Sequence, residues 1–244
     1  MGDSGRGNAS APKAAAGLKA VAFDLDGTLY PNYRFYARLF PLILRHPRFF
    51  RAFALVRRRL HEADADAPAG GTNGTNFYRR QAALMSELLG VRVDEQSMER
   101  RVYRPWENCF ARVRLFPFVA ETAAALKGAG LKLGLLSDFP PERKLILLGL
   151  EGVFDTVLCT EITGRLKPNR LPFDTLARAM AVEAESILYV GNSPRFDVAG
   201  AKAAGMRAAL IKRGPASTGR CSAETAAADF VFRDYRQLRQ YVLG

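Results

Sequence analysis

The 244-residue sequence has few cysteines and no long apolar run. Its three cysteines, Cys109, Cys159 and Cys221, form no Cys-x-x-Cys pair, and an odd number provides no disulfide framework. No apolar stretch reaches the roughly 18–20 residues that a membrane-spanning helix needs. Residues 1–17 are small and polar, unlike a secretory signal, and we interpret them as a disordered tail. These absences favour a protein of the reducing cytoplasm with no membrane partner.

Acidic residues are also in the minority, because 24 Asp and Glu against 36 Lys and Arg give a net charge of +12. A strongly basic protein can bind nucleic acid. The charges are spread along the chain, however, and no RNA- or DNA-binding motif is present, so we expect no nucleic-acid partner. A basic surface still attracts small phosphorylated metabolites. Nothing in the sequence indicates the oligomeric state.

Short apolar runs alternate with helical segments over most of the chain. The runs predicted to form strands are Lys19–Phe23, Leu131–Leu136, Asp155–Cys159, Ile187–Val190, Ala208–Ile211 and Phe230–Phe232. The helical segments between and after them are Val119–Lys127, Glu142–Leu148, Phe173–Met180, Asp197–Ala204 and Tyr235–Leu243. This alternation predicts an α/β fold with a doubly wound parallel sheet, covered by helices on both faces. The carboxyl ends of its strands should meet at one edge, where ligands bind.

Residues 31–114 interrupt this alternation. They contain no strand pattern, and the helices predicted there are Phe35–Leu44, Arg48–Glu62, Phe77–Leu89 and Gln96–Phe110. The Gly-, Ala- and Asn-rich segment Ala63–Asn76 predicts a mobile loop. We therefore predict a tail over 1–17, an α/β core domain over 18–30 and 115–244, and an inserted helical cap domain over 31–114.

The first part of this insert, residues 35–60, is rich in aromatic residues and arginines. Such a composition also suits a helix on a membrane surface, but Pro41 and Pro47 interrupt it, so packing of an apolar face inside the insert is favoured. His46 and His61 lie in the insert away from every motif in sequence, and we expect surface or packing roles for both. We expect Cys159 to be an inert core residue.

The strongest chemical pattern is Val-Ala-Phe-Asp-Leu-Asp-Gly-Thr-Leu-Tyr, residues 21–30. A strand delivers Asp24 and Asp26 at its carboxyl end, and Gly27 then lets the backbone turn sharply. Two carboxylates with different surroundings can take different chemical roles. One can act as a nucleophile and the other as a proton donor.

Three further motifs follow in order, each after a predicted strand. They are Leu135-Leu136-Ser137-Asp138, Lys167-Pro168 and Gly191-Asn192-Ser193-Pro194-Arg195-Phe196-Asp197. Together with the Asp-Leu-Asp-Gly-Thr run, they resemble the four motifs of the haloacid dehalogenase (HAD) superfamily of hydrolases, over residues 18 to about 243. The resemblance implies a Rossmann-like HAD core, and the insert resembles the C1 cap of that family.

The resemblance also implies roles for individual residues. Asp24 would be the nucleophile that forms an aspartyl-phosphate, and Asp26 would act first as an acid and then as a base. Ser137 and Lys167 would complete the catalytic set. The phosphoryl group would be bound by Ser137, Lys167 and the backbone N–H groups of Gly27 and Thr28. A Mg²⁺ cofactor would be bound by Asp24, the backbone carbonyl of Asp26, Asn192 and Asp197.

Electrostatics require positive charge at such a site, independently of any family. A phosphate monoester dianion repels an attacking carboxylate by roughly 4 kcal/mol per pair of unit charges at about 4 Å and an effective dielectric constant near 20. Lys167 and a Mg²⁺ ion with oxygen ligands would supply that positive charge. Asn192, however, stands where the common motif has aspartate, and its amide brings no charge. We therefore expect weaker Mg²⁺ affinity, with Asp197 compensating more of the metal's charge.

The leading hypothesis is a Mg²⁺-dependent phosphatase that hydrolyses a small phosphorylated metabolite. One alternative is a HAD-like module that binds a phosphate ligand or a protein and has little or no turnover, which Asn192 motivates. Another is a 2-haloacid dehalogenase. Asp26 disfavours it, because the corresponding motif of those enzymes resembles Asp-x-Tyr, with tyrosine where this chain has Asp26. The substrate would be selected by the cap, where Tyr33, Arg34, Arg38 and Arg104 are candidates.

Overall fold

The computed structural model describes residues 16–65, 67–68, 74–110, 112–212 and 227–244. Its centre is a six-stranded sheet with the strand order β3-β2-β1-β4-β5-β6, and every neighbouring pair is parallel. The strands are β1 (Ala20–Phe23), β2 (Lys132–Ser137), β3 (Thr156–Cys159), β4 (Ile187–Gly191), β5 (Arg207–Ile211) and β6 (Phe230–Phe232). The predicted parallel sheet is confirmed. Cys221 and residues 1–15 of the predicted tail lie outside the described residues.

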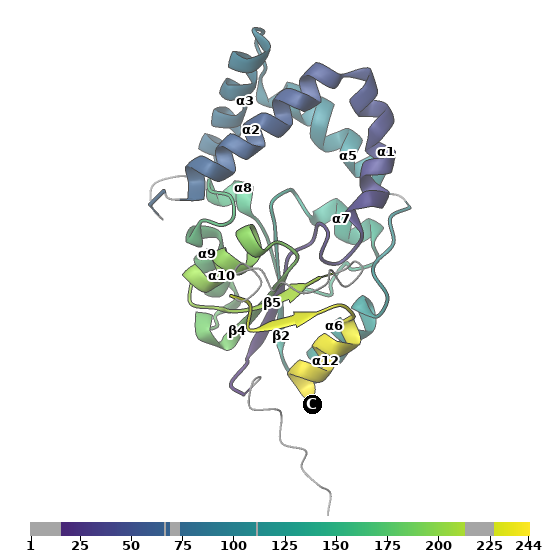
Figure 1. Ribbon diagram of the computed structural model, residues 1–244, viewed down its shortest axis with the longest axis vertical. Helices are drawn as coiled ribbons and strands as arrows, with labels where there is room; N and C mark the ends of the chain where they lie inside the picture. The colour runs from purple at the N-terminus through teal and green to yellow at the C-terminus, as the bar shows by residue number, and fades with distance from the viewer. Residues whose placement is uncertain (1–15, 66, 69–73, 111, 213–226) are drawn as a thin grey trace, which may run out of the picture.

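Alternation of side chains along the strands buries both faces of the sheet. In β1, Val21 and Phe23 belong to one apolar cluster, whereas Ala20 and Ala22 belong to another on the opposite face. Helices cover both faces, which confirms the doubly wound arrangement (Figure 1). The first cluster contains residues of α6 (Val119–Gly128), α7 (Glu142–Leu147) and α12 (Tyr235–Leu243), and the second contains residues of α9 (Arg170–Met180) and α10 (Ala199–Ala203).

Between β1 and β2 the chain forms a group of helices that lies beyond the carboxyl edge of the sheet (Figure 1). These insert helices are α1 (Asn32–Arg45), α2 (Pro47–Ala65), α3 (Gly74–Leu89), α4 (Glu95–Met98), η2 (Glu99–Tyr103) and α5 (Arg104–Cys109). Among the described helices of the protein, none combines the length and the apolar character that crossing a membrane requires. The division of the chain at residues 31 and 114 stays a prediction.

Several details of the insert differ from the sequence prediction. Pro41 lies inside α1 and does not interrupt it, and because Pro41 is exposed, water can reach the carbonyl that its missing N–H leaves free. Pro47 begins α2, where a missing N–H costs nothing. The helix predicted over 96–110 consists of α4, α5 and a π-helical turn between them. The predicted loop is shorter than expected, because α2 ends at Ala65 and α3 begins at Gly74; positions 66 and 69–73 lie outside the described residues.

The insert helices are joined to the sheet by apolar and polar contacts. Apolar residues of both parts belong to one continuous cluster. Arg57 of α2 donates to Glu161 Oε1 at 2.5 Å and to the carbonyl of Asp138 at 2.9 Å. Glu161 belongs to α8 (Thr160–Thr163), and both side chains of this ion pair are buried. The contacts with Glu161 and Asp138 hold α2 over the carboxyl ends of β2 and β3.

Candidate active site

Residues from three neighbouring strands meet at the carboxyl edge of the sheet. Asp24 follows β1, Ser137 ends β2, and Asn192 follows β4. The strand order reverses at β1, because β2 and β3 lie on one side of it and β4, β5 and β6 on the other. Such a switch point opens a crevice between the connections that leave the strands in opposite directions. Three of the four sequence motifs are therefore brought together at this edge of the sheet.

Asp24 lies at the centre of this site and is almost fully buried. Its Oδ1 accepts a hydrogen bond from Lys167 Nζ at 2.7 Å, and its Oδ2 accepts one from Thr28 Oγ1 at 2.6 Å. Lys167 Nζ also lies 2.8 Å from Asp197 Oδ1. The other oxygen of Asp197 accepts from the backbone N–H groups of Asn192 and Ser193. The ammonium of Lys167 thus bridges two buried carboxylates.

Burial and charge shift the pKa values of this group in opposite directions. Burial raises the pKa of Asp24 to about 7, with Lys167 opposing the shift and the carboxylates of Asp197 and Asp26 adding to it. Burial lowers the pKa of Lys167, but Asp197 and Asp24 outweigh burial and hold that pKa well above its usual range. Lys167 is therefore a permanent cation, whereas the charge of Asp24 responds to its surroundings near neutral pH.

Asp26 faces different surroundings from those of Asp24. Its side chain is partly exposed, and its two carboxylate oxygens lie 2.7 and 2.9 Å from Lys144 Nζ. The hydroxyl of Tyr30 donates to Asp26 Oδ1, and Ser137 Oγ lies 3.5 Å from Oδ2. These contacts fix the orientation of the Asp26 carboxylate.

Lys144 was missed by the sequence analysis. It lies on α7, is buried, and its ammonium is within 5.0 Å of the ring centre of Phe110 and 5.4 Å of that of Phe139. The available signal was weak: a lysine seven positions after Ser137 on a predicted amphipathic helix reads as a solvated residue. Only the packing of α7 against the site shows that it faces Asp26.

The residues predicted to bind Mg²⁺ provide a mixed set of oxygen donors. Asn192 Nδ2 lies 3.2 Å from the backbone carbonyl of Asp26, and a Cβ on Gly27 would meet the same amide nitrogen at 2.0 Å. Glycine at position 27 therefore leaves the room that this amide occupies beside the carbonyl. Carboxylate, carbonyl and amide oxygens are the ligands that Mg²⁺ takes, so Asp24, the Asp26 carbonyl and Asn192 fit the ion. No cluster of three or more His, Cys, Asp or Glu side chains suited to a metal occurs within the described residues.

The remaining predicted residues lie at the site, and their roles stay predictions. Ser137 is fully buried, and its hydroxyl oxygen accepts from the N–H of Phe139 at 3.2 Å. The N–H of Thr28 has an acceptor in the carbonyl of Leu25 at 3.3 Å, and the hydroxyl of Thr28 binds Asp24. Oδ2 of Asp197 accepts from two backbone N–H groups and Oδ1 from Lys167, so Oδ1 keeps a lone pair that could bind a metal.

The segment that carries Lys167 is held by α2. His61 Nδ1 lies 2.6 Å from the Lys167 carbonyl oxygen, and the His61 ring packs on Phe196 with ring centres 4.6 Å apart. Asp64, also on α2, accepts from Arg165 and from the N–H of Leu166, both at 3.0 Å. His61 Nε2 also lies 3.8 Å from Asp138 Oδ2, so His61 is distant from the motifs in sequence but in contact with three of them in space, and its role there is packing and positioning.

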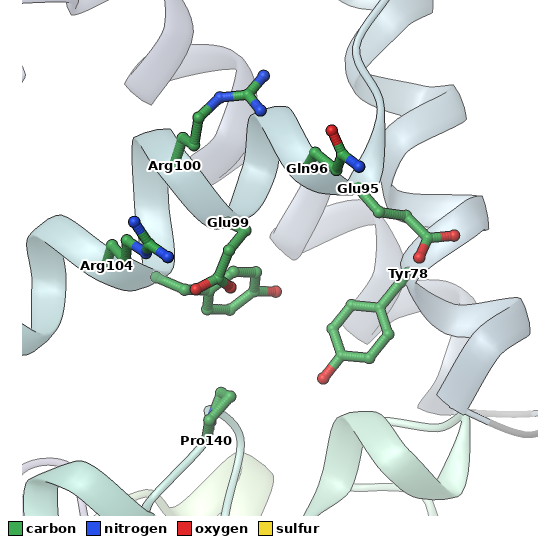
Figure 2. A pocket seen from close by; sticks show the side chains of 8 residues that line it. Tyr78, Glu95, Gln96, Glu99, Arg100, Arg104 and Pro140 are labelled. Carbon is green, nitrogen blue, oxygen red and sulfur yellow. The ribbon is translucent and has the colours of Figure 1, made fainter.

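A pocket of about 250 Å³ lies beside Asp26, between the insert helices and α7. None of the four proposed substrate-selecting residues belongs to its lining. Tyr33 and Arg34 line a separate depression next to Gly27 and Asn192. Arg104 lines a third depression of about 510 Å³, formed by insert helices and Pro140, and Figure 2 shows its labelled residues Tyr78, Glu95, Gln96, Glu99, Arg100, Arg104 and Pro140.

Comparison with known proteins finds relatives over most of the chain. Residues 18–205 match the model of the haloacid dehalogenase-like hydrolases. The glyceraldehyde 3-phosphate phosphatase of Methanothermobacter thermautotrophicus is 30% identical over 198 residues, which are 80% of this chain and 85% of that protein. The phosphoglycolate phosphatase of Yersinia pestis is 28% identical over 204 residues, which are 77% of this chain and 78% of that protein.

Solved structures share the fold. A HAD phosphatase from Thermococcus onnurineus aligns with a TM-score of 0.62 and 23% identity, covering 93% of this chain and 99% of that chain. The L-2-haloacid dehalogenase of Xanthobacter autotrophicus aligns with a TM-score of 0.63 and 22% identity, with the same coverage. Proteins with two different chemistries thus share this architecture, so the fold alone does not decide the reaction.

The raised pKa of Asp24 predicts how stability depends on pH in metal-free buffer. The folded protein keeps a proton on Asp24 that the unfolded chain has released, so this group's contribution to the free energy of unfolding falls as pH rises from about 4 to about 7. Asp24→Asn removes that cost, and we expect it to raise the free energy of unfolding by on the order of 4 kcal/mol at pH 8 and by less than about 1 kcal/mol at pH 4.

Urea unfolding at the two pH values measures this difference. Asp174→Asn is the matched control, because Asp174 pairs with an exposed arginine on α9 and its loss should change little. An Asp24→Asn variant that is less stable than wild type at pH 8 would contradict the raised pKa of Asp24.

Proposed function

The chain belongs to the haloacid dehalogenase-like hydrolases, and on that premise we propose that it is a phosphatase in which Asp24 attacks the phosphorus of a phosphate monoester. The observation that carries this proposal is the contact of the buried Asp24 with Lys167 at 2.7 Å. At the carboxyl edge of a parallel sheet, the cation of such a pair can bind an anion, and the carboxylate beside it can form a bond to that anion.

In the first half of the reaction, an Asp24 carboxylate oxygen forms a bond to phosphorus and the bond from phosphorus to the alcohol oxygen breaks. Asp26, in its protonated form, gives its proton to that oxygen, so the alcohol leaves neutral. Lys144 and Tyr30 hold the Asp26 side chain at the pocket where the alcohol lies. Lys167 and Ser137 donate hydrogen bonds to phosphoryl oxygens and stabilise the charge that develops there.

In the second half, water hydrolyses the aspartyl-phosphate. Asp26, now a carboxylate, takes a proton from the water as its oxygen bonds to phosphorus, and the bond from phosphorus to Asp24 breaks. Inorganic phosphate leaves, and both aspartates return to their starting states. The insert helices lie beyond the carboxyl edge of the sheet (Figure 1), where Asp24 is almost fully buried, so bulk water would have limited access to the intermediate.

The charges at the site support a divalent cation, which we propose is Mg²⁺. The carboxylates of Asp24 and Asp197 face one ammonium group, that of Lys167. Binding of a phosphate dianion adds further negative charge, and a bound Mg²⁺ would neutralise it. Asp24, the Asp26 carbonyl and Asn192 are the proposed ligands, with Asp197 Oδ1 as a fourth.

The substrate is proposed to be a small phosphorylated molecule. Relatives that match about four fifths of the chain are phosphatases of glyceraldehyde 3-phosphate and of phosphoglycolate. The pocket beside Asp26, about 250 Å³, accommodates an alcohol of modest size. The insert helices supply most of its lining and would therefore act as the specificity-determining cap.

Dehalogenation is a weaker candidate. A haloacetate dehalogenase of a Moraxella species is 32% identical to this chain, but over only 107 residues. Displacement of a halide needs no proton donor, and Asp26, held by two side chains at the pocket, would then have no chemical role. Chloride release from a 2-chloroacid without added metal would favour this candidate.

The nucleophile assignment predicts the effect of one substitution. Asp24→Asn should lower kcat for p-nitrophenyl phosphate on the order of 10³-fold or more, because an amide oxygen does not attack phosphorus. The assay follows p-nitrophenolate release with Mg²⁺ present. Asp174→Asn should stay within about twofold of wild type, since an exposed ion pair contributes little. An Asp24→Asn enzyme within tenfold of wild type would refute the assignment.

The amide at position 192 predicts a change in metal affinity. Asn192→Asp adds a negative charge beside the Asp26 carbonyl and should raise the apparent Mg²⁺ affinity about tenfold, whereas Asn192→Ala, which removes the donor oxygen, should lower it. Titration of Mg²⁺ against phosphatase activity and isothermal calorimetry measure the affinity independently. If all three proteins have the same affinity, residue 192 does not bind the metal.

A further inference from the structure

The pocket beside Asp26 has a chemical character that points to a substrate class. This inference rests on the proposed function, because Asp26 protonates the oxygen of the leaving alcohol. The pocket that Asp26 lines is then the place where the rest of that alcohol lies. Its walls come mainly from α1, α2 and α5, together with Phe139 and Lys144.

Aromatic rings dominate the walls. The ring of Trp106 lies 5.4 Å from that of Phe35, 5.6 Å from that of Phe53 and 4.8 Å from that of Phe139, measured between centres. Phe35 and Phe53 are buried, and Tyr36 borders the same pocket with 55% of its surface exposed. Such rings offer edges and faces to another ring, which adds to the gain from removing apolar surface from water.

Both cations of the pocket have a carboxylate partner, although the Nε–H of Arg57 is buried without an acceptor among the described residues. Arg57 pairs with the fully buried Glu161, and Lys144 pairs with Asp26. A ligand carboxylate would therefore compete with Glu161 for Arg57, and with Asp26 for Lys144 whenever Asp26 is ionised. The indole N–H of Trp106 is buried and has no hydrogen-bond partner among the described residues. It can donate one hydrogen bond to a ligand but offers no full charge.

We propose that the substrate is the phosphate monoester of an alcohol that carries an uncharged apolar ring of about benzyl size. A cavity of about 150 Å³ lined by apolar side chains is sufficient for benzene. The volume here, about 250 Å³, holds a ring with the methylene group that connects it to the phosphate oxygen. The same walls disfavour phosphoglycolate, whose leaving alcohol carries a carboxylate.

The test compares substrates whose leaving groups are primary alcohols, so that differences in intrinsic reactivity are small. We expect kcat/KM for benzyl phosphate to exceed that for phosphoglycolate and that for methyl phosphate by on the order of 30-fold or more, because only the ring is removed from water in the pocket. Equal values for the three, or a preference for phosphoglycolate, would overturn the proposal while leaving the phosphatase function in place.

Substitutions of residues that line the pocket test whether the ring of the substrate lies there. Ala54 lines the pocket from an exposed position on α2, so Ala54→Leu narrows the cavity with little risk to folding. The ratio of kcat/KM for benzyl phosphate to that for methyl phosphate should fall about tenfold in Ala54→Leu and about threefold in Tyr36→Ala. Phe40→Ala is the matched control, because Phe40 lies one turn from Tyr36, is similarly exposed and lies outside the pocket lining. An unchanged ratio in Ala54→Leu contradicts the proposal.

A binding measurement separates this proposal from the proposed function. Trp106 is the single tryptophan of the chain, so its fluorescence reports directly on this pocket. Benzylphosphonate, which is not hydrolysed, should change the emission saturably, and methylphosphonate at the same concentration should not. If no phosphate monoester is hydrolysed but benzylphosphonate binds in this way, the phosphatase function fails and the ring site stands. If hydrolysis occurs and benzylphosphonate leaves the emission unchanged, the ring site is wrong.

Discussion

The ammonium of Lys167, held between the carboxylates of Asp24 and Asp197, is the interaction on which the site depends. Two buried carboxylates that share one binding partner repel each other strongly, and the cation between them makes that arrangement possible. It joins the end of β1, the segment before α9 and the π-helical turn after β4, three regions far apart in sequence. A phosphoryl oxygen bound beside Asp24 would meet the same ammonium group. The contact of Lys167 with Asp24 therefore serves both the stability of the site and the proposed reaction.

The position of Lys167 depends in turn on the insert helices. His61 and Asp64 of α2 bind the backbone and neighbours of Lys167, and Arg57 binds Glu161 and the carbonyl of Asp138. Any movement of α2 away from the sheet would break these contacts and free the segment that carries Lys167. The insert is thus both a wall of the pocket and a support for the residue that balances the charge of the nucleophile.

Much of this arrangement was predictable from the sequence, for physical reasons. Apolar runs between helical segments specify a parallel sheet, and the resemblance to the HAD motifs pointed to Asp24, Ser137, Lys167 and Asp197. What could not be predicted depends on contacts between distant parts of the chain. Lys144 pairs with Asp26 across 118 positions, and Arg57 pairs with Glu161 across 104, and in sequence both read as ordinary charged helix residues. The aromatic pocket was missed because its rings come from α1, α2, α5 and the loop after β2, and only packing brings them together.

The most direct test of the account is a crystal structure of the protein with beryllofluoride, a mimic of the phosphoryl group, and Mg²⁺. We predict beryllium bonded to an Asp24 carboxylate oxygen, with Lys167 Nζ within hydrogen-bond distance of a fluoride and Asp26 facing the pocket. Beryllofluoride bound away from Asp24, or an Asp24 carboxylate that stays turned from a bound mimic, would contradict the claim that this side chain attacks phosphorus.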